Sequence, residues 1–468
     1  MMEDEDEFRN RISTVDESGK RVWVYPKKPK GKFTNYRKMV AYSLLAILFI
    51  LPFIKLHGEP LIMLNIIERK FVIFGFIFWP QDLYIFALAM IISVVFVIFF
   101  TIIFGRLFCG WVCPQTIFME FVFRQVEYWI DGDFKHQRKL KEGPWTKEKI
   151  FKRLLKHSIF ILIAVVTANI FLAYIIGIDE LKNIITDPIQ THLGGFIAMI
   201  LFSGAFYMVF SLLREQVCTT ICPYGRLQGV LLDENSMVIA YDYARGERTE
   251  GRAKFRKNEN REELGKGDCI DCYQCVNVCP TGIDIRNGTQ LECINCTACI
   301  DACDDMMLGV GLPKGLIRFA SEKNIKEKEP FKFTTRVKAY SALLMVLIIV
   351  LTVLLITRSD FDSKITRQRG TTFMITQDGQ VSNIFEIYLL NKTRIDYDIT
   401  LELEGNHGTI ETVAHDIHLK AEEQLKERFV VKIPYAETKS SEKLLINVYG
   451  NGKKIQTVKT KFLGPIVL

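Results

Sequence analysis

The sequence predicts a multi-domain protein in which an α-helical membrane part with five transmembrane helices carries an inserted, cysteine-rich α+β domain and ends in a β-sandwich. Three observations predict this fold class. Long apolar runs lack charge, two copies of one cysteine pattern lie between the last two runs, and the C-terminal residues alternate apolar and polar side chains. With 468 residues, 49% of them hydrophobic, the chain is long enough for about two or three domains.

Four apolar runs are each close to the ~20 residues that a helix needs to cross the hydrocarbon core. These runs are Tyr84–Phe104, Ser158–Ile178, Leu193–Leu213 and Ala339–Thr357. A fifth run, Met39–Ile54, is shorter and contains Pro52, but Lys55 can extend it into the membrane interface, so we expect it to span as well. The segment Phe71–Trp79 has only about half the required length, which predicts an interfacial or re-entrant segment.

Positive charges predict the orientation of these helices. The tail before the first run and the connection between the second and third runs are rich in Lys and Arg, whereas the loop after Ile178 offers only Lys182. Because positive loops stay in the cytoplasm, the protein is expected in the inner (cytoplasmic) membrane, with the cysteine-rich domain inside and the chain from about Phe361 outside. The acidic first residues do not resemble a cleaved signal peptide, so the first helix is expected to remain as an anchor.

The net charge of +7 follows from this orientation, and no aromatic-basic module supports nucleic-acid binding. The expected parts are a cytoplasmic tail (1–36), a region of four membrane helices (37–235), the cysteine-rich domain (236–335), a fifth membrane helix (336–358) and an outer domain (361–468).

Eight of the 12 cysteines form two copies of the run C-x2-C-x2-C-x3-C. This spacing is typical of ferredoxins with two [4Fe–4S] clusters, in which the fourth cysteine of each run binds the other cluster. The pattern predicts one cluster on Cys269, Cys272, Cys275 and Cys303, and a second on Cys293, Cys296, Cys299 and Cys279. Zinc ribbons use two separated C-x2-C pairs, and disulfide frameworks suit small secreted domains, so both alternatives fit less well.

The other four cysteines form two C-x3-C-P motifs, Cys109 to Pro114 and Cys218 to Pro223, each directly after a predicted membrane helix. Each cysteine of the second motif follows its counterpart in the first motif after the same number of residues, which indicates a duplicated unit. This duplication predicts that the four thiols meet at one membrane face. A proline after the second cysteine favours the start of a new helix there, whose positive end, with Arg106 and Arg226, is expected to lower the thiol pKa values. Copper, an additional Fe–S cluster and a redox dithiol remain open as the chemistry of this site, with plain packing of small apolar cysteines as the alternative.

Between Leu232 and Cys269, the sequence predicts a strand at Met237–Tyr241 followed by a charged, mobile surface loop. From Phe361 onward, four segments alternate apolar and polar residues. They are Ile384–Leu390, Tyr397–Leu403, Phe429–Ile433 and Leu444–Val448. Turn signals at Asp378-Gly379, Gly405-Asn406 and Asn451-Gly452 support a β-sandwich without cysteine.

Motifs along nearly the whole chain resemble the cytochrome c oxidase accessory proteins called CcoG, FixG or RdxA. They are Trp79-Pro-Gln-Asp82, Cys109-Gly-Trp-Val-Cys113-Pro-Gln-Thr116, Trp129-Ile-Asp-Gly-Asp133, Arg214-Glu-Gln-Val-Cys218, Cys222-Pro-Tyr-Gly-Arg226, Tyr241-Asp-Tyr-Ala-Arg-Gly-Glu247, Gly267-Asp-Cys-Ile-Asp-Cys272, Cys279-Pro-Thr-Gly-Ile-Asp-Ile285 and Gly315-Leu-Ile-Arg318.

This resemblance implies a membrane-bound reductase of Cu(II) to Cu(I) that serves assembly of a cbb3-type oxidase, and an immunoglobulin-like outer domain. It further implies that Cys109, Cys113, Cys218 and Cys222 carry the copper chemistry and receive electrons from the ferredoxin domain. The implied partners are oxidase-assembly components and copper carriers, with an unknown electron donor and a homodimer as one possible assembly. Two other functions stay open: a general quinol-linked electron-transfer subunit, and a non-redox scaffold for oxidase assembly.

Overall fold

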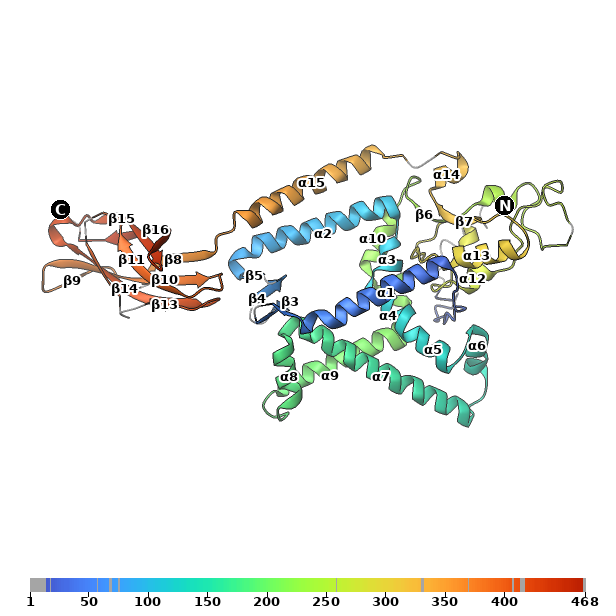
Figure 1. The fold of residues 1–468 in the computed structure, drawn as a ribbon, viewed down its shortest axis with the longest axis horizontal. Helices are drawn as coiled ribbons and strands as arrows, with labels where there is room; N and C mark the ends of the chain where they lie inside the picture. The colour runs from blue at the N-terminus through green and yellow to red at the C-terminus, as the bar shows by residue number, and fades with distance from the viewer. Residues whose placement is uncertain are drawn as a thin grey trace. The chain divides into compact units, whose positions relative to one another are not determined.

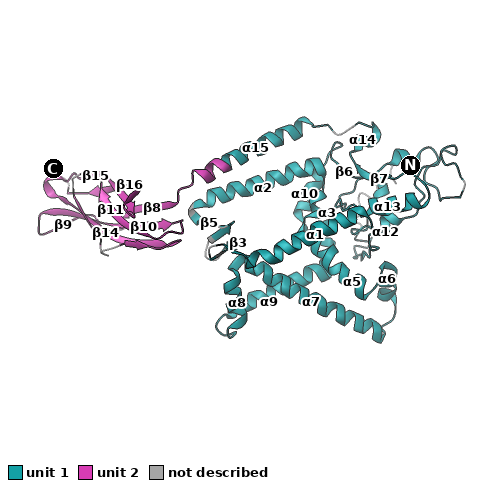
Figure 2. Cartoon of the chain, viewed as in Figure 1, with its two compact units in different colours: residues 1–351 teal, residues 352–468 magenta. Residues whose placement is uncertain are grey.

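The computed structural model describes residues 14–465, except 17, 57, 67–69, 75, 258, 330–331, 369, 406–407 and 413–416. It divides into two compact units, Met1–Leu351 and Thr352–Leu468 (Figure 2). Of the tail expected at 1–36, residues 1–13 and 17 lie outside the described residues. Asn406, which belongs to one of the expected turns, also lies outside them.

Five helices among the described residues are long and apolar enough to cross a membrane, which confirms the predicted spans. Large apolar side chains such as Leu201 and Val346 are exposed on the surfaces of these helices, as expected where lipid is the solvent. The helices are α1 (Lys32–Ile50) with η2 (Leu51–Phe53), α2 (Leu83–Phe104), α7 (Lys147–Ile176), α9 (Leu193–Met208) with the π-helix η5 (Val209–Leu213), and α15 (Thr335–Ile356) (Figure 1).

Short helices connect these spans at the end where α2 and η5 stop. They are α3 (Leu107–Trp111), α4 (Pro114–Phe118), the π-helix η4 (Met119–Phe123), α5 (Arg124–Ile130), α6 (Phe134–Glu142), the π-helix η6 (Val217–Ile221) and α10 (Pro223–Leu231). At the other end, α8 (Ile178–Thr186) joins α7 to α9. A cluster of buried aromatic rings, including Phe118, Phe123, Phe160 and Phe210, packs the short helices against α7 and η5.

The segment Phe71–Trp79, which the sequence predicts to be interfacial or re-entrant, consists mainly of short strands. The strands β3 (Ile62–Asn65), β4 (Lys70–Ile73) and β5 (Phe76–Phe78) pair antiparallel, and the turn η3 (Pro80–Asp82) then leads into α2. Two shorter strands, β1 (Lys55–Leu56) and β2 (Glu59–Pro60), precede this sheet. Met63, Val72 and Ile77 form its small buried core, which the sequence reading did not foresee.

The cysteine-rich region begins and ends with two strands that pair with each other. The strand β6 (Val238–Tyr241) confirms the predicted strand and pairs antiparallel with β7 (Ile317–Ala320). Between them and just after them lie α11 (Tyr243–Glu247), α12 (Gln274–Asn277), η7 (Ile285–Asn287), α13 (Ala298–Gly309) and α14 (Glu322–Lys326). The charged segment after β6 is not uniformly solvated, because Arg261 is buried and donates to the backbone carbonyls of Ala253 and Gly267.

The second unit contains two antiparallel sheets, which confirms the predicted strands. One sheet has the order β12 (Thr409–Thr412), β14 (Gln424–Pro434), β10 (Gln380–Asn391), β8 (Phe361–Arg367), with β9 (Met374–Ile375) also paired to β10. The other has the order β13 (Ile417–Leu419), β11 (Tyr397–Leu403), β15 (Ser441–Gly450), β16 (Lys453–Leu463), and the turn η8 (Tyr435–Glu437) joins β14 to β15. Phe385 and Phe429 from the first sheet and Ile446 and Val448 from the second share one core.

Candidate functional site

The structure gathers the eight run cysteines into two groups. One small cavity is lined by Cys269, Cys272, Cys275 and Cys303. The other is lined by Cys279, Cys293, Cys296 and Cys299, together with Cys275. Cys279, the last cysteine of the first run, therefore lies with the first three cysteines of the second run, and Cys303 lies with the first three of the first run. This is the arrangement that the spacing predicts.

The backbone of the two runs bends in the same way around each cavity. Asp271 and Tyr273 in the first run, and Asn295 and Thr297 in the second, all have positive φ angles between 52° and 66°. These left-handed conformations are uncommon for residues other than glycine, and they curl each loop so that its first three cysteines face one point. The helix α13 then contributes Cys299 to one cavity and Cys303 to the other.

Apolar side chains surround both cavities. Ile239, Ile283 and Ile285 line one, and Leu316 and Ile317 line the other. Burial in this setting raises the pKa of Cys293 to about 12 and that of Cys296 to about 11. A buried thiol then stays protonated unless a metal takes the place of the proton, and the soft thiolates that result are suitable ligands for an iron–sulfur cluster.

At least four cysteine thiols line each cavity. A [4Fe–4S] cluster is typically held by four thiolates, so the donor set of each cavity fits such a cluster.

The four cysteines of the C-x3-C-P motifs also lie together, and we call them the membrane-face thiols. Cys109 lies in α3, Cys113 immediately precedes α4, Cys218 lies in η6 and Cys222 immediately precedes α10. Electrostatic interactions connect Cys109 with Cys113 and Cys222, and Cys218 with Cys109 and Cys113. The prolines begin α4 and α10, as the sequence predicts.

The predicted lowering of the thiol pKa is wrong for Cys109, Cys113 and Cys218. Burial raises the pKa of Cys109 to about 11 and that of Cys218 to about 12. The guanidinium of Arg106 lowers both values, but by less than burial raises them, and Arg226 is exposed. Desolvation thus outweighs the nearby positive charge, and these thiols are not activated by a low pKa.

The first motif is packed directly against the loop of the second cysteine run. Cys109 shares a buried cluster with Ile294 and Cys296. A Cβ atom on Gly110 would lie 2.4 Å from the carbonyl oxygen of Ile294 and 3.0 Å from the Cα of Cys296, so only glycine fits this contact. The indole Nε1 of Trp111 also donates to the carbonyl oxygen of Asn295 at 3.3 Å.

Arg106 joins the two motifs and this loop. It is 3% exposed, its Nη1 donates to the carbonyl oxygen of Leu291, and its Nε donates to Oε1 of Gln228 at 3.2 Å. Cys109 Sγ lies 3.0 Å from the same Oε1 atom, and Arg106 Nη2 lies 3.5 Å from the carbonyl oxygen of Cys218. One buried cation therefore reaches both C-x3-C-P motifs and the cysteine-rich domain.

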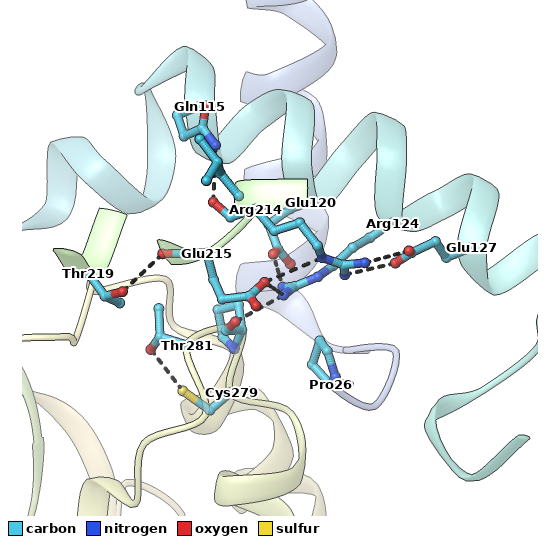
Figure 3. A network of polar contacts seen from close by, with 12 residues as sticks. Pro26, Gln115, Glu120, Arg124, Glu127, Arg214, Glu215, Thr219, Cys279 and Thr281 are labelled. Carbon is cyan, nitrogen blue, oxygen red and sulfur yellow. Dashed lines mark hydrogen bonds and ion pairs between the residues drawn. The ribbon is translucent and has the colours of Figure 1, made fainter. Parts of the chain in front are cut away.

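Buried ion pairs form a second connection, which we call the ion cage (Figure 3). Arg214 makes two hydrogen bonds to the carboxylate of Glu127, at 2.6 Å and 2.9 Å. Arg124 lies 3.4 Å from Glu215 Oε2 and donates to the carbonyl oxygen of Pro280 at 3.0 Å, directly after Cys279. Sequence reasoning missed this cage, although Arg214 and Glu215 directly follow a membrane span and so are expected to need partners.

Comparisons with known proteins agree with this geometry. Residues 86–141 match a family described as a 4Fe-4S binding domain, and residues 213–322 match a 4Fe-4S dicluster domain. Residues 351–465 match the family described as the IG-like fold at the C-terminal of FixG, putative oxidoreductase. The chain is therefore a multi-pass membrane protein of iron–sulfur electron transfer with an immunoglobulin-like C-terminal domain.

Similar proteins cover most of the chain. Protein RdxA of Cereibacter sphaeroides is 33% identical over 402 residues, which are 83% of each chain. Nitrogen fixation protein FixG of Rhizobium meliloti is 31% identical over 82% of this chain and 80% of its own. A crystal structure of a FixG-related protein from Vibrio parahaemolyticus matches 23% of this chain and 100% of its own, with 16% identity and a TM-score of 0.21. From the extent and identity of the RdxA match, this chain belongs to the FixG/RdxA family.

Proposed function

We propose that this protein is a membrane-bound cupric reductase that delivers Cu(I) for the assembly of a cbb3-type cytochrome c oxidase. Its family membership and its 4Fe–4S domains support the electron-transfer part of this proposal. The observation that carries it is the direct packing of the membrane-face thiols on the loop of the second cysteine run, through Gly110.

The residues of the chain contribute positioning and shielding. Iron–sulfur clusters held by the eight run cysteines would supply single electrons, and one electron is what the reduction of Cu(II) to Cu(I) requires. The apolar walls around Cys293 and Cys296 exclude water from the site. Arg106 and the ion cage hold the cysteine-rich domain against the membrane helices, so that the separation between the two sites stays short.

The orientation belongs to the same proposal. The distribution of Lys and Arg between the loops favours a cytoplasmic location for the tail and the cluster-binding domain, and an outer location for the C-terminal domain. In that orientation the clusters lie where cellular reductants are available, and the outer domain is free to contact oxidase-assembly components and copper carriers.

A Cu(II)-reduction assay on the full-length protein in detergent tests the function. Protein prepared without oxygen and reduced with dithionite, then freed from excess reductant, is mixed with Cu(II) and a Cu(I)-specific chelator. We expect Cu(I) to form in the native protein and to be lost when Cys109, Cys113, Cys218 and Cys222 are replaced by serine.

The iron signals of the cysteine-rich domain serve as the control for that variant, because their retention shows that the fold is intact. Unchanged Cu(I) formation in a variant with these signals would refute the copper role. Oxidation of a quinol by the protein, with no effect of copper, would favour the general electron-transfer subunit instead. Oxidase assembly in cells that contain only a cluster-free variant would favour the scaffold.

A further inference from the structure

We propose that the four membrane-face thiols, Cys109, Cys113, Cys218 and Cys222, bind a third [4Fe–4S] cluster. This inference deepens the proposed function, because it assigns the cofactor at the site from which electrons leave the protein. It concerns the binding of iron and stands or falls separately from the reduction of copper.

The number of available ligands is the first argument. The match to a 4Fe-4S binding domain covers residues 86–141, and this stretch contains only two cysteines, Cys109 and Cys113. A cluster of this type is typically held by four thiolates, so two must come from elsewhere. The eight run cysteines already line two other cavities, which leaves Cys218 and Cys222 as the remaining cysteines of the chain.

The structure places the two remaining cysteines beside the first pair. Cys222 is close enough to influence both Cys109 and Cys113 electrostatically, and Cys218 is influenced by the same two thiols. All four are free thiols without a disulfide between them. The two copies of the C-x3-C-P motif thus lie together, and each copy supplies two of the four thiols.

The charge around the site is the last argument. A cluster held by four thiolates is negatively charged, and a buried negative charge needs a nearby cation. Arg106 is buried and interacts with Cys109, Cys113 and Cys218, and it also reaches Leu291 in the loop of the second run. The same guanidinium is thus placed to compensate clusters on both sides of it.

Iron and acid-labile sulfide counts per chain, on full-length protein purified in detergent without oxygen, test this proposal. With three clusters we expect about 12 iron atoms per chain, because each cluster has four. Replacement of the membrane-face thiols by serine is expected to remove about four of these, and with them one set of EPR signals. A matched variant with serine at Cys269, Cys272, Cys275 and Cys303 is expected to lose the same amount of iron but a different set of signals.

About eight iron atoms in the native protein, unchanged by the serine replacements at the membrane face, would overturn the proposal, as would stoichiometric copper in place of that iron. If the replaced protein fails to fold and loses all iron, the count in the native protein still decides. Native protein with about 12 iron atoms that does not reduce Cu(II) would retain the third cluster and refute the proposed function. About eight iron atoms per chain together with full Cu(II) reduction would refute the third cluster and leave the proposed function standing.

Discussion

Individual charged residues at the membrane boundary are held by strong, buried pairing. Arg214 and Glu127 are 4% and 5% exposed at their side chains, and two hydrogen bonds join them. Burial raises the pKa of Glu127 and is the largest single effect, but Arg214, Lys156 and Arg124 together lower it by more, so the pKa stays below its usual value. Glu127 therefore remains charged, and the pair is stable only while both partners are present.

Replacement of Arg214 by methionine is expected to destabilise the protein by about 3–5 kcal/mol, because it leaves the Glu127 carboxylate buried without its partner. The unfolding temperature of the detergent-solubilised protein measures this change. The variant Lys55→Ala is the control, since Lys55 and Asp179 form a largely exposed pair and its loss should cost only about 0–1 kcal/mol.

A second replacement separates loss of the charge pair from loss of packing. If Arg214→Met leaves an uncompensated charge, the double variant Arg214→Met with Glu127→Leu should recover most of the lost stability. No recovery would indicate that Arg214 acts mainly through its other contact, to Glu215.

At the scale of elements, the contact between α3 and the loop of the second cysteine run depends on a missing side chain. Gly110 lies in a helix, where glycine costs about 1 kcal/mol relative to alanine. The structure gives the reason for this unfavourable residue, because the carbonyl oxygen of Ile294 occupies the space of a Cβ atom. Glycine at this position destabilises the helix but allows α3 and the loop of the second cysteine run to approach each other closely.

We expect Gly110→Ala to push the loop away from α3 and to lower both the iron content and the unfolding temperature. Gly204→Ala is the matched control, because Gly204 also lies in a helix but a Cβ atom there would meet no atom within 4 Å. Iron analysis and thermal unfolding of the two variants measure the difference. Equal behaviour of both variants would show that the loop tolerates the added methyl group.

At the scale of the whole molecule, the uneven distribution of Lys and Arg predicts which parts lie on each side of the membrane. Two exposed lysines allow a direct measurement, Lys257 in the cysteine-rich region and Lys443 in the C-terminal domain. Each is replaced by cysteine, and spheroplasts are treated with a maleimide that does not cross membranes.

We expect Lys443→Cys to react in intact spheroplasts and Lys257→Cys to react only after the membrane is permeabilised. The native cysteines are expected to react little, since they are buried or half-buried. Reaction of Lys257→Cys before permeabilisation would reverse the proposed orientation, and with it the location of the clusters.

The sequence by itself determined the features that depend on local composition and spacing. Hydropathy identified the five spans, alternation identified the strands of the C-terminal domain, and the two cysteine runs predicted the groups that line the two cavities. These signals are local. The residues that specify a membrane span, the alternation of a strand or a cluster-binding loop all lie close to one another in the chain.

Only the tertiary structure decided the features that depend on burial and on distant contacts. The pKa of Cys109 is raised rather than lowered because the fold removes it from water, which the sequence around Arg106 does not reveal. Gly110 meets Ile294, and Arg124 meets Pro280, across long stretches of chain. Desolvation and long-range packing are properties of the assembled fold, and they are what bring the membrane-face thiols to the cluster-binding domain.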